Sequence, residues 1–435
     1  MNKHQFSRRG FLGTAAAAGA PFILPSGMWG ASKSGKGPNN RINLGLIGMG
    51  RRLTGIAGAF SELQDVQMVA VSDCVEERLK GYGVKRVQDL YNHRKRSSKG
   101  LKAHADFRAI MEDKSIDAVA IGTPDHWHAI MSIMAARAGK HVYCEKPLTR
   151  TIGEGRAVVK AARDNKIVFQ TGSQQRTEYG GKFRTAVEYV RSGRIGDLKK
   201  IYIGVGNPPK PDDLPDEDLP TGIDWNMWLG PAPQRGFNHV LCPIGLHKHF
   251  PQWRAYREYA GGQLSDIGAH HFDIAQWAMD EDNSGPIRVS PPDDPSAGQG
   301  LEFKYKSGIT MVHSRELGKK GCVFVGTKGE IRVGRGHLES TPDGILKAPL
   351  TKNDFHLPKI AARHQFNWID CIRSGERPVA DVEIGHRTNT VCMLANIGYQ
   401  LNRDLHWDPK KEEFKGDKGA SSLMNQSERS PWNKV

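Results

Sequence analysis

The sequence predicts an α/β protein of two domains, the first built on a doubly wound parallel sheet and the second on an open, mostly antiparallel sheet with helices. Three observations predict this class. Short apolar runs alternate with helix-like segments in the first part of the chain, and strand-like segments follow one another without helices after about residue 195. The 435 residues, 38% of them hydrophobic, are enough for more than one core.

The first domain is expected over residues 40–165 and rests on the apolar runs. The expected strands occupy residues 43–47, 66–71, 117–121, 141–144 and 167–171. Helix-like segments include residues 127–138 and 152–164, and Thr151 is the expected N-cap of the second. Strands that alternate with helices are typical of a parallel sheet, because each new parallel strand needs a crossover connection.

The second domain is expected over residues 166–407. Its expected strands occupy residues 199–206, 301–305, 310–314, 322–326 and 330–333, and its expected helices residues 364–374 and 385–401. Residues 208–220 and 284–300 are predicted loops because proline and aspartate are frequent there. Residues 408–435 form a polar C-terminal tail, which we expect to wrap the surface.

Residues 1–32 have the pattern of an export signal. The twin-arginine pair Arg8-Arg9 precedes an apolar stretch at 11–24 that is too short to span a bilayer as a mature helix. The pattern predicts export by the twin-arginine route to the periplasm, with a membrane anchor as the outcome if the signal is not cleaved. No other segment is long and apolar enough to cross a membrane, so the mature chain is expected to lack a transmembrane segment.

The charge of the chain indicates either a soluble basic protein or one that favours anionic substrates, and it does not favour nucleic acid as a partner. The formal net charge is +15, and five of these charges lie in residues 1–40. No helix or aromatic platform organises the rest for nucleic acid, and the densest basic run, residues 94–102, is a predicted solvated loop. The six cysteines are scattered without a C-x-x-C pair, and His247-Lys248-His249 lacks an adjacent carboxylate cluster, so no metal site is predicted.

A Gly-x-Gly motif follows the first predicted strand and opens a predicted helix. The first glycine, Gly48, permits a tight turn, and Gly50 lets the backbone approach a pyrophosphate at the helix N-terminus, with Met49 and Arg51 beside it. Asp73 ends the second strand, where a carboxylate binds ribose hydroxyls and disfavours the 2′-phosphate of NADP; a helix N-cap is the alternative. The motif predicts NAD, with NADP as the second possibility.

Two more motifs stand at predicted strand ends, where open sheets bind ligands. Thr123-Pro124, with His128, follows the third strand, although a helix-capping turn would give the same pattern. Glu145-Lys146-Pro147 follows the fourth. These residues are candidates for contact with the cofactor.

The candidate proton-transfer residues combine Lys146 with a helix about 120 residues later. Asp266, His270 and Asp273 have helical spacing and share one face. A carboxylate one turn from an imidazole orients it and raises its basicity, and a base of near-neutral pKa suits the deprotonation of an alcohol. A merely polar helix face is the alternative. Residues with hydrogen-bonding or stacking groups suited to sugars are Arg176, Tyr179, Trp253, Arg254 and Asp273.

With these motifs the chain resembles the Gfo/Idh/MocA oxidoreductases, the family of glucose–fructose oxidoreductase and inositol dehydrogenase. The resemblance covers nearly all of the mature chain, and together with the twin-arginine segment and residues 425–432 it points to an exported subgroup. Leu53 replaces the third glycine of the family's motif, and Gln263 follows Gly261-Gly262.

The resemblance implies a Rossmann domain with NAD or NADP, tightly bound, and a sugar or cyclic polyol above the nicotinamide. It implies that Lys146, Asp266 and His270 take the catalytic positions and that the Lys146–Pro147 bond is cis. It also implies homo-oligomers formed through the C-terminal sheet.

The predicted function is an NAD(P)-dependent oxidoreductase that moves hydride between the cofactor and a hydroxyl carbon of a sugar, sugar derivative or polyol. His270 accepts the hydroxyl proton, Asp266 orients His270, and Lys146 stabilises the oxyanion. One alternative is a redox-neutral glycosidase or lyase that uses NAD; the other is a non-catalytic sugar-binding protein. The sequence leaves the particular sugar and the direction of reaction open.

Overall fold

The computed structural model describes residues 41–247, 250–294, 296–361 and 363–434, which belong to one compact unit. The twin-arginine motif and the apolar stretch after it, as well as Lys248 and His249, lie outside the described residues. Within the described ranges, no helix has both the length and the apolarity needed to cross a membrane.

Six parallel strands form the first sheet. In spatial order they are β3 (Lys102–His104), β2 (Val66–Ser72), β1 (Ile42–Ile47), β4 (Ala118–Ile121), β5 (His141–Cys144) and β6 (Phe169–Thr171). All four residues of β4 are buried, since a sheet with helices on both faces excludes water from both. The strand order reverses between β1 and β4, and ligands of open α/β sheets bind at the carboxyl ends beside such a reversal.

The helical segments around this sheet connect its strands. They are α2 (Arg51–Glu62), η3 (Arg78–Val84), α3 (Lys85–His93), α4 (Arg108–Glu112), η4 (Asp125–Trp127), α5 (His128–Arg137) and α6 (Ile152–Asp164). Helix α6 begins in a capping box: Glu154 donates its backbone N–H to the Thr151 side chain, and the Glu154 carboxylate accepts the N–H of Thr151. The expected cap and helix are therefore confirmed.

Nine strands form the second sheet, which is mixed and mostly antiparallel; only β7 and β10 pair in parallel. In spatial order they are β13 (Leu338–Thr341), β12 (Glu330–Val333), β11 (Cys322–Gly326), β7 (Leu198–Ile203), β10 (Thr310–His313), β9 (Glu302–Lys304), β8 (Arg288–Ser290), β14 (Leu405–Asp408) and β15 (Glu413–Phe414). Both expected sheets are thus present.

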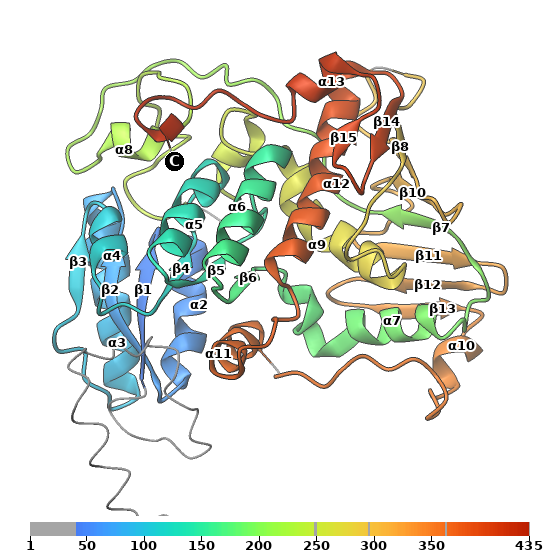
Figure 1. Cartoon of the computed structure of the whole chain (residues 1–435), viewed down its shortest axis with the longest axis horizontal. Coiled ribbons are helices and arrows are strands. Elements are labelled where there is room, and N and C mark those ends of the chain that lie inside the picture. The colour runs from blue at the N-terminus through green and yellow to red at the C-terminus, as the bar shows by residue number, and fades with distance from the viewer. Residues whose placement is uncertain (1–40, 248–249, 295, 362, 435) are drawn as a thin grey trace, which may run out of the picture. The chain divides into compact units, whose positions relative to one another are not determined.

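Three helices pack beside the second sheet: α7 (Lys182–Arg191), α9 (Gly262–Ala278) and α12 (Val382–Leu401) (Figure 1). Their apolar residues, including Phe272 and Leu394, form one core with strand residues such as Phe303 and Phe324. Helix α12 also contacts α6 and β6, so it connects the two sheets. The other helical segments are η5 (Gln174–Arg176), η6 (Tyr179–Gly181), α8 (Trp225–Leu229), η7 (Gln252–Ala255), α10 (Gly344–Lys347), α11 (His364–Ser374), α13 (Lys418–Ser422) and η8 (Trp432–Lys434).

The structure differs from the sequence prediction at several places. Strand β6 lies in the first sheet and confirms the strand expected at 167–171, so the boundary expected at residue 165 lies too early in the chain. The basic run at 94–102 is not simply a solvated loop, because Arg94 donates to Ser61 Oγ at 2.8 Å and Arg96 to the Leu63 carbonyl at 2.8 Å. The C-terminal tail does not only lie on the surface as expected, because the buried ring of Trp432 packs edge-on against Trp127.

Candidate active site

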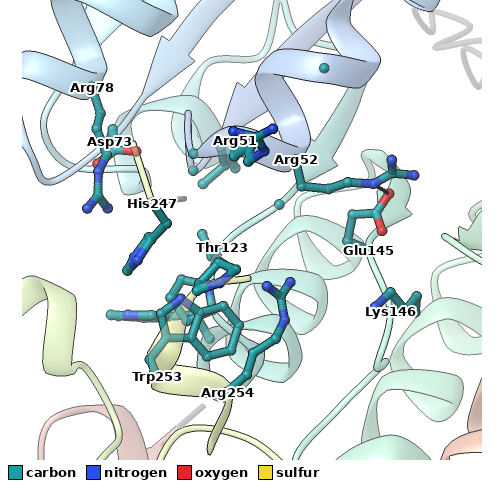
Figure 2. A pocket seen from close by; sticks show the side chains of 18 of the residues that line it. Arg51, Arg52, Asp73, Arg78, Thr123, Glu145, Lys146, His247, Trp253 and Arg254 are labelled. Carbon is teal, nitrogen blue, oxygen red and sulfur yellow. Dashed lines mark ion pairs between the residues drawn. The ribbon is translucent and has the colours of Figure 1, made fainter. Parts of the chain in front are cut away.

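A pocket of about 360 Å³ opens at the carboxyl ends of the first sheet and is lined by residues of both sheet regions. This volume lies within the range of small-molecule sites. Figure 2 shows Asp73 and Arg78 on one side of the pocket and Glu145 and Lys146 on the other, so the pocket is elongated.

The glycine motif forms the floor of one end of the pocket. Gly48 adopts the left-handed φ of 85°, and a Cβ there would lie 2.7 Å from Thr123 Cγ2, so no other residue fits this turn without a shift. Gly50 is the N-cap of α2 and has no side chain to cap the helix; a Cβ on it would meet no protein atom within 4 Å. The first turn of α2 therefore presents uncapped backbone N–H groups to the pocket, which suits a pyrophosphate.

Asp73 and Arg78 mark the far end of the pocket. One oxygen of the buried Asp73 carboxylate accepts the N–H of Val75 at 2.9 Å, as in the capping alternative, yet Asp73 also lines the pocket. Burial raises the pKa of Asp73, and Arg78 opposes this rise. Arg78 in turn donates its Nε–H to the Gly245 carbonyl at 3.0 Å, which fastens this end to the loop that contains His247.

Glu145 is a buried carboxylate in the middle of the pocket. Its Oε1 lies 2.9 Å from Arg52 Nε (Figure 2) and accepts the side-chain N–H of Gln174 at 2.8 Å. Its Oε2 and the hydroxyl of Thr123 are buried without a hydrogen-bond partner among the described residues. Unsatisfied buried groups beside an uncapped helix indicate a missing polar ligand. The residues present thus fit a nicotinamide dinucleotide.

Lys146 and Asp266 meet where the two sheet regions face each other. The Lys146 ammonium donates to Asp266 Oδ1 at 2.6 Å and to the Asp266 backbone carbonyl at 2.8 Å. Arg254 Nε lies 2.8 Å from the same carboxylate oxygen. Burial acts to raise the pKa of Asp266, but Lys146 and Arg254 outweigh it, so the pKa is lowered and Asp266 stays ionised. The Lys146–Pro147 bond is cis, as the resemblance implies.

The expected Asp266–His270 orientation is absent, because the Asp266 carboxylate faces Lys146 and Arg254. The buried His270 lines the pocket, and its Nδ1 has no hydrogen-bond partner among the described residues. Burial lowers its pKa well below the usual value, and the positive charge of Lys146 lowers it further. His270 is therefore a neutral imidazole and a weaker base than the near-neutral one that the sequence predicted.

Asp125 is a second buried carboxyl near this centre, and the sequence did not single it out. It follows Pro124 in η4, and its Oδ1 has no hydrogen-bond partner among the described residues. Burial raises its pKa to about 7; the nearby Asp266 raises it too, while Arg254 opposes the shift. Asp125 is thus a group that titrates near neutral pH.

Several predicted site residues lie outside the pocket lining. Met49 is fully buried, and His128 holds its ring nitrogens 2.7 Å from the Pro147 carbonyl and 3.0 Å from the Thr123 carbonyl. His128 therefore positions two loops. Arg176 and Asp273, expected to contact substrate, form a buried ion pair with each other at 2.8 Å, so their charges are matched within the fold.

The other candidate substrate residues, Tyr179, Trp253 and Arg254, line the pocket. Sequence reasoning missed Arg52, Arg78 and Arg335, which also line it. Arg52 could have been predicted, because it directly follows the predicted cofactor residue Arg51. No local pattern marks Arg335, which lies in a turn of the second sheet. His247 lines the pocket as well, and the described residues contain no cluster of His, Cys, Asp or Glu that is arranged to hold a metal.

Family models match both parts of the chain. Residues 42–173 match the NAD-binding Rossmann fold of the GFO/IDH/MocA oxidoreductases, and residues 197–434 match their C-terminal alpha/beta domain.

Named relatives act on sugars and polyols. The chain is 26% identical over 271 residues to the 1,5-anhydro-D-fructose reductase of Ensifer adhaerens, covering 59% of this chain and 68% of that one. It is 28% identical over 282 residues to the myo-inositol 2-dehydrogenase of Thermotoga maritima, covering 65% of this chain and 62% of that one, which is less than two thirds of the relative.

Among solved structures, a levoglucosan dehydrogenase in complex with NADH and levoglucosan has the same fold. The TM-score is 0.55 at 18% identity, and the match covers 84% of this chain and 99% of that one.

Proposed function

This chain belongs to the GFO/IDH/MocA oxidoreductase family, and from that premise we propose that it moves hydride between a nicotinamide cofactor and a hydroxyl carbon of a sugar or cyclic polyol. One observation carries the proposal: the Lys146–Asp266 pair and the neutral His270 line the same pocket as the uncapped N-terminus of α2. The named activities of the relatives support the substrate class.

Residues at one end of the pocket would hold the cofactor. When bound, a nicotinamide dinucleotide supplies the hydride acceptor or donor. The backbone N–H groups at Gly50 and Arg51 would hold its pyrophosphate, and Asp73 would hold the ribose hydroxyls. The carboxylate of Asp73 repels a 2′-phosphate, which favours NAD over NADP. Glu145 and Thr123 offer acceptor and hydroxyl groups that have no other described partner.

The other end of the pocket handles the proton of the substrate hydroxyl. Oxidation removes a hydride from carbon and a proton from oxygen, so the protein must accept one proton. His270 is neutral and so has a free position for this proton, although the same burial makes it a weaker base than an exposed histidine. The Lys146 ammonium, held in place by Asp266, stabilises the charge that develops on the oxygen.

We also propose that the protein is exported, that it releases its cofactor slowly and that it forms homo-oligomers. The twin-arginine pattern supports export to the periplasm, and the loop fastened by Arg78 next to Asp73 supports a slowly released cofactor. The open nine-stranded sheet offers a face for homo-oligomers.

The test begins with nucleotide content. The purified protein is denatured, released small molecules are identified by mass spectrometry, and the absorbance of reduced nicotinamide is followed while sugars, polyols and glycosides are added. The proposal expects a bound or bindable NAD and its reduction by one substrate class. A cleaved glycoside without net reduction would instead identify the redox-neutral glycosidase. Sugar binding without any nicotinamide binding would identify a non-catalytic binding protein.

A further inference from the structure

The ionisable groups that line the pocket carry an excess of positive charge. Six of them are cationic and three are carboxylates; the histidines of the lining have lowered pKa values and are neutral. The cations are Arg51, Arg52, Arg78, Lys146, Arg254 and Arg335, and the carboxylates are Asp73, Glu145 and Asp266. The excess is therefore three positive charges.

A dinucleotide offsets only part of this excess. Its pyrophosphate carries two negative charges and would lie near Arg51, at the N-terminus of α2, while the oxidised nicotinamide ring adds one positive charge. Arg52 is paired with Glu145, and Lys146 shares Asp266 with Arg254. At least one positive charge then has no counterpart among the described residues or the cofactor, one with reduced and two with oxidised nicotinamide.

Arg335 carries that charge at the substrate end. It lies in the turn between β12 and β13, and no ion pair joins it to a carboxylate among the described residues. Its positive charge contributes to the lowered pKa of His270 and of Asp266, which places it beside the proton-transfer groups.

Tyr179 contacts the exposed side chain of Arg335. The Arg335 guanidinium lies 5.0 Å from the centre of the Tyr179 ring. Tyr179 adopts the left-handed φ of 60°, a conformation that costs energy in a residue with a side chain. Such strain is typical of functional sites, where the surrounding structure holds a side chain in a required place. The Arg335 guanidinium is thus presented on an aromatic platform at the pocket.

Resting on the proposed function, we propose that the substrate is an anionic sugar, a sugar acid whose carboxylate is bound by Arg335. The planar guanidinium forms two parallel hydrogen bonds with a carboxylate, and the opposite charges strengthen this pairing in a way that a neutral sugar cannot. A sulfate ester presents oxygens to the same group, so the sulfated sugar is a separate arm of the test.

The experiment compares matched sugars on the protein saturated with NAD. Isothermal titration calorimetry gives Kd for D-glucose, D-glucuronate and D-glucose 6-sulfate, and for D-galactose and D-galacturonate. The variants are Arg335→Gln, which removes the charge, and Arg335→Lys, which keeps the charge without the planar fork. Arg332→Gln is the matched control, because Arg332 lies on the same hairpin but pairs with Glu330 outside the pocket.

We expect one uronate to bind about ten- to a hundredfold more tightly than its neutral sugar, which is the usual strength of a charged hydrogen-bonded pair. Arg335→Gln is expected to abolish this preference without changing the Kd of the neutral sugar, Arg335→Lys to retain part of it, and Arg332→Gln to leave it intact. Tighter binding of the sulfate than of every uronate, lost in Arg335→Gln, would overturn the carboxylate assignment.

Two further outcomes separate this inference from the proposed function. Reduction of NAD by neutral sugars, with no preference for uronates in the wild-type protein, would overturn the inference and leave the oxidoreductase intact. Uronate binding that depends on Arg335 but reduces no nicotinamide would support the inference for the pocket while refuting the redox activity.

Discussion

Helix α9 carries two buried ion clusters that differ in composition and in access to the pocket. At Asp266, one carboxylate oxygen faces two cations, Lys146 at 2.6 Å and Arg254 at 2.8 Å. At Asp273, the ratio is reversed: Arg176 lies between Asp273 at 2.8 Å and Asp282 at 2.6 Å. The first cluster lines the pocket, and the second does not.

The pKa shifts follow from this difference. The two cations lower the pKa of Asp266 against the effect of burial. At Asp273 burial prevails over Arg176, so its pKa is raised. Two aspartates on one face of a helix can therefore have different roles, which their charged partners decide. Asp266 lies at the proposed reaction centre, whereas Asp273 lies in the folded core. The pocket cluster has a cation in excess, which is available to a ligand, whereas the Arg176 cluster has a carboxylate in excess and its charged groups pair with one another.

The largest effect is expected from Lys146→Ala, which removes the charge that stabilises the oxyanion. We expect kcat to fall by about 10²- to 10³-fold, the usual cost of removing one group that stabilises an oxyanion. The melting temperature should change little, because Arg254 still faces Asp266. Steady-state kinetics and calorimetry measure the two effects, and Lys160→Ala on the exposed surface of α6 is the control. Unchanged kcat in Lys146→Ala would remove Lys146 from the mechanism.

Arg176→Met tests the second cluster and should act on stability. Removal of the guanidinium leaves Asp273 buried without its cation, which costs about 3–5 kcal/mol for a buried pair. Urea unfolding measures this loss, and the KM of the folded protein should remain unchanged. The matched control is Arg191→Met: Arg191 pairs with Asp280, whose side chain is 72% exposed, so the expected cost is about 0–1 kcal/mol. A raised KM with unchanged stability would return Arg176 to the substrate contacts.

The pH dependence of kcat/KM distinguishes the ionisable groups at the substrate end of the pocket. His270 acts as a base in its neutral form, and its pKa lies well below 6.5, so its protonation should not reduce kcat/KM near that pH. A decrease in kcat/KM toward acid pH with a midpoint near 7 would instead come from Asp125, whose pKa is about 7. Asp125→Asn should abolish this decrease. A midpoint near 6.5 that persists in Asp125→Asn would contradict the burial assigned to His270.

The smallest expected effect is the acid dependence of stability at Asp266. Its folded-state pKa is lowered, so the ionised carboxylate stabilises the fold above the unfolded-state pKa of about 4, and this contribution is lost as the pH falls through the folded-state pKa. Urea unfolding of the wild type and of Asp266→Asn should therefore converge in acid. A difference in stability that stays constant below pH 4 would show that the ion pair contributes nothing.

The sequence predicted elements that are defined by local pattern. Strands β5, β11 and β12 and helices α6 and α11 begin and end where expected. Strands β3, β8, β13, β14 and β15 were missed, since each has two to four residues and few buried positions. Their pairing with neighbouring strands, rather than their own periodicity, makes them strands.

The sequence predicted only part of the site, because the remaining contacts depend on packing between distant segments. Helical spacing places Asp266, His270 and Asp273 on one face, but it does not say how far along the helix the pocket extends. Asp273 lies about 10 Å from Asp266 along the helix axis, beyond the pocket, where it meets Arg176. The partner of Asp266 is likewise decided by the packing of the two sheet regions. Arg335 comes from a turn with no motif, so only the folded chain reveals it.

The order of synthesis gives the Lys146–Asp266 contact another consequence. The two residues are 120 positions apart, so a chain that folds as it emerges completes the strand before Lys146 long before Asp266 exists. Until α9 forms, the nascent first sheet holds its lysine without the carboxylate that positions it. The centre for proton transfer is therefore assembled late, when the part of the chain that selects the substrate is already being made.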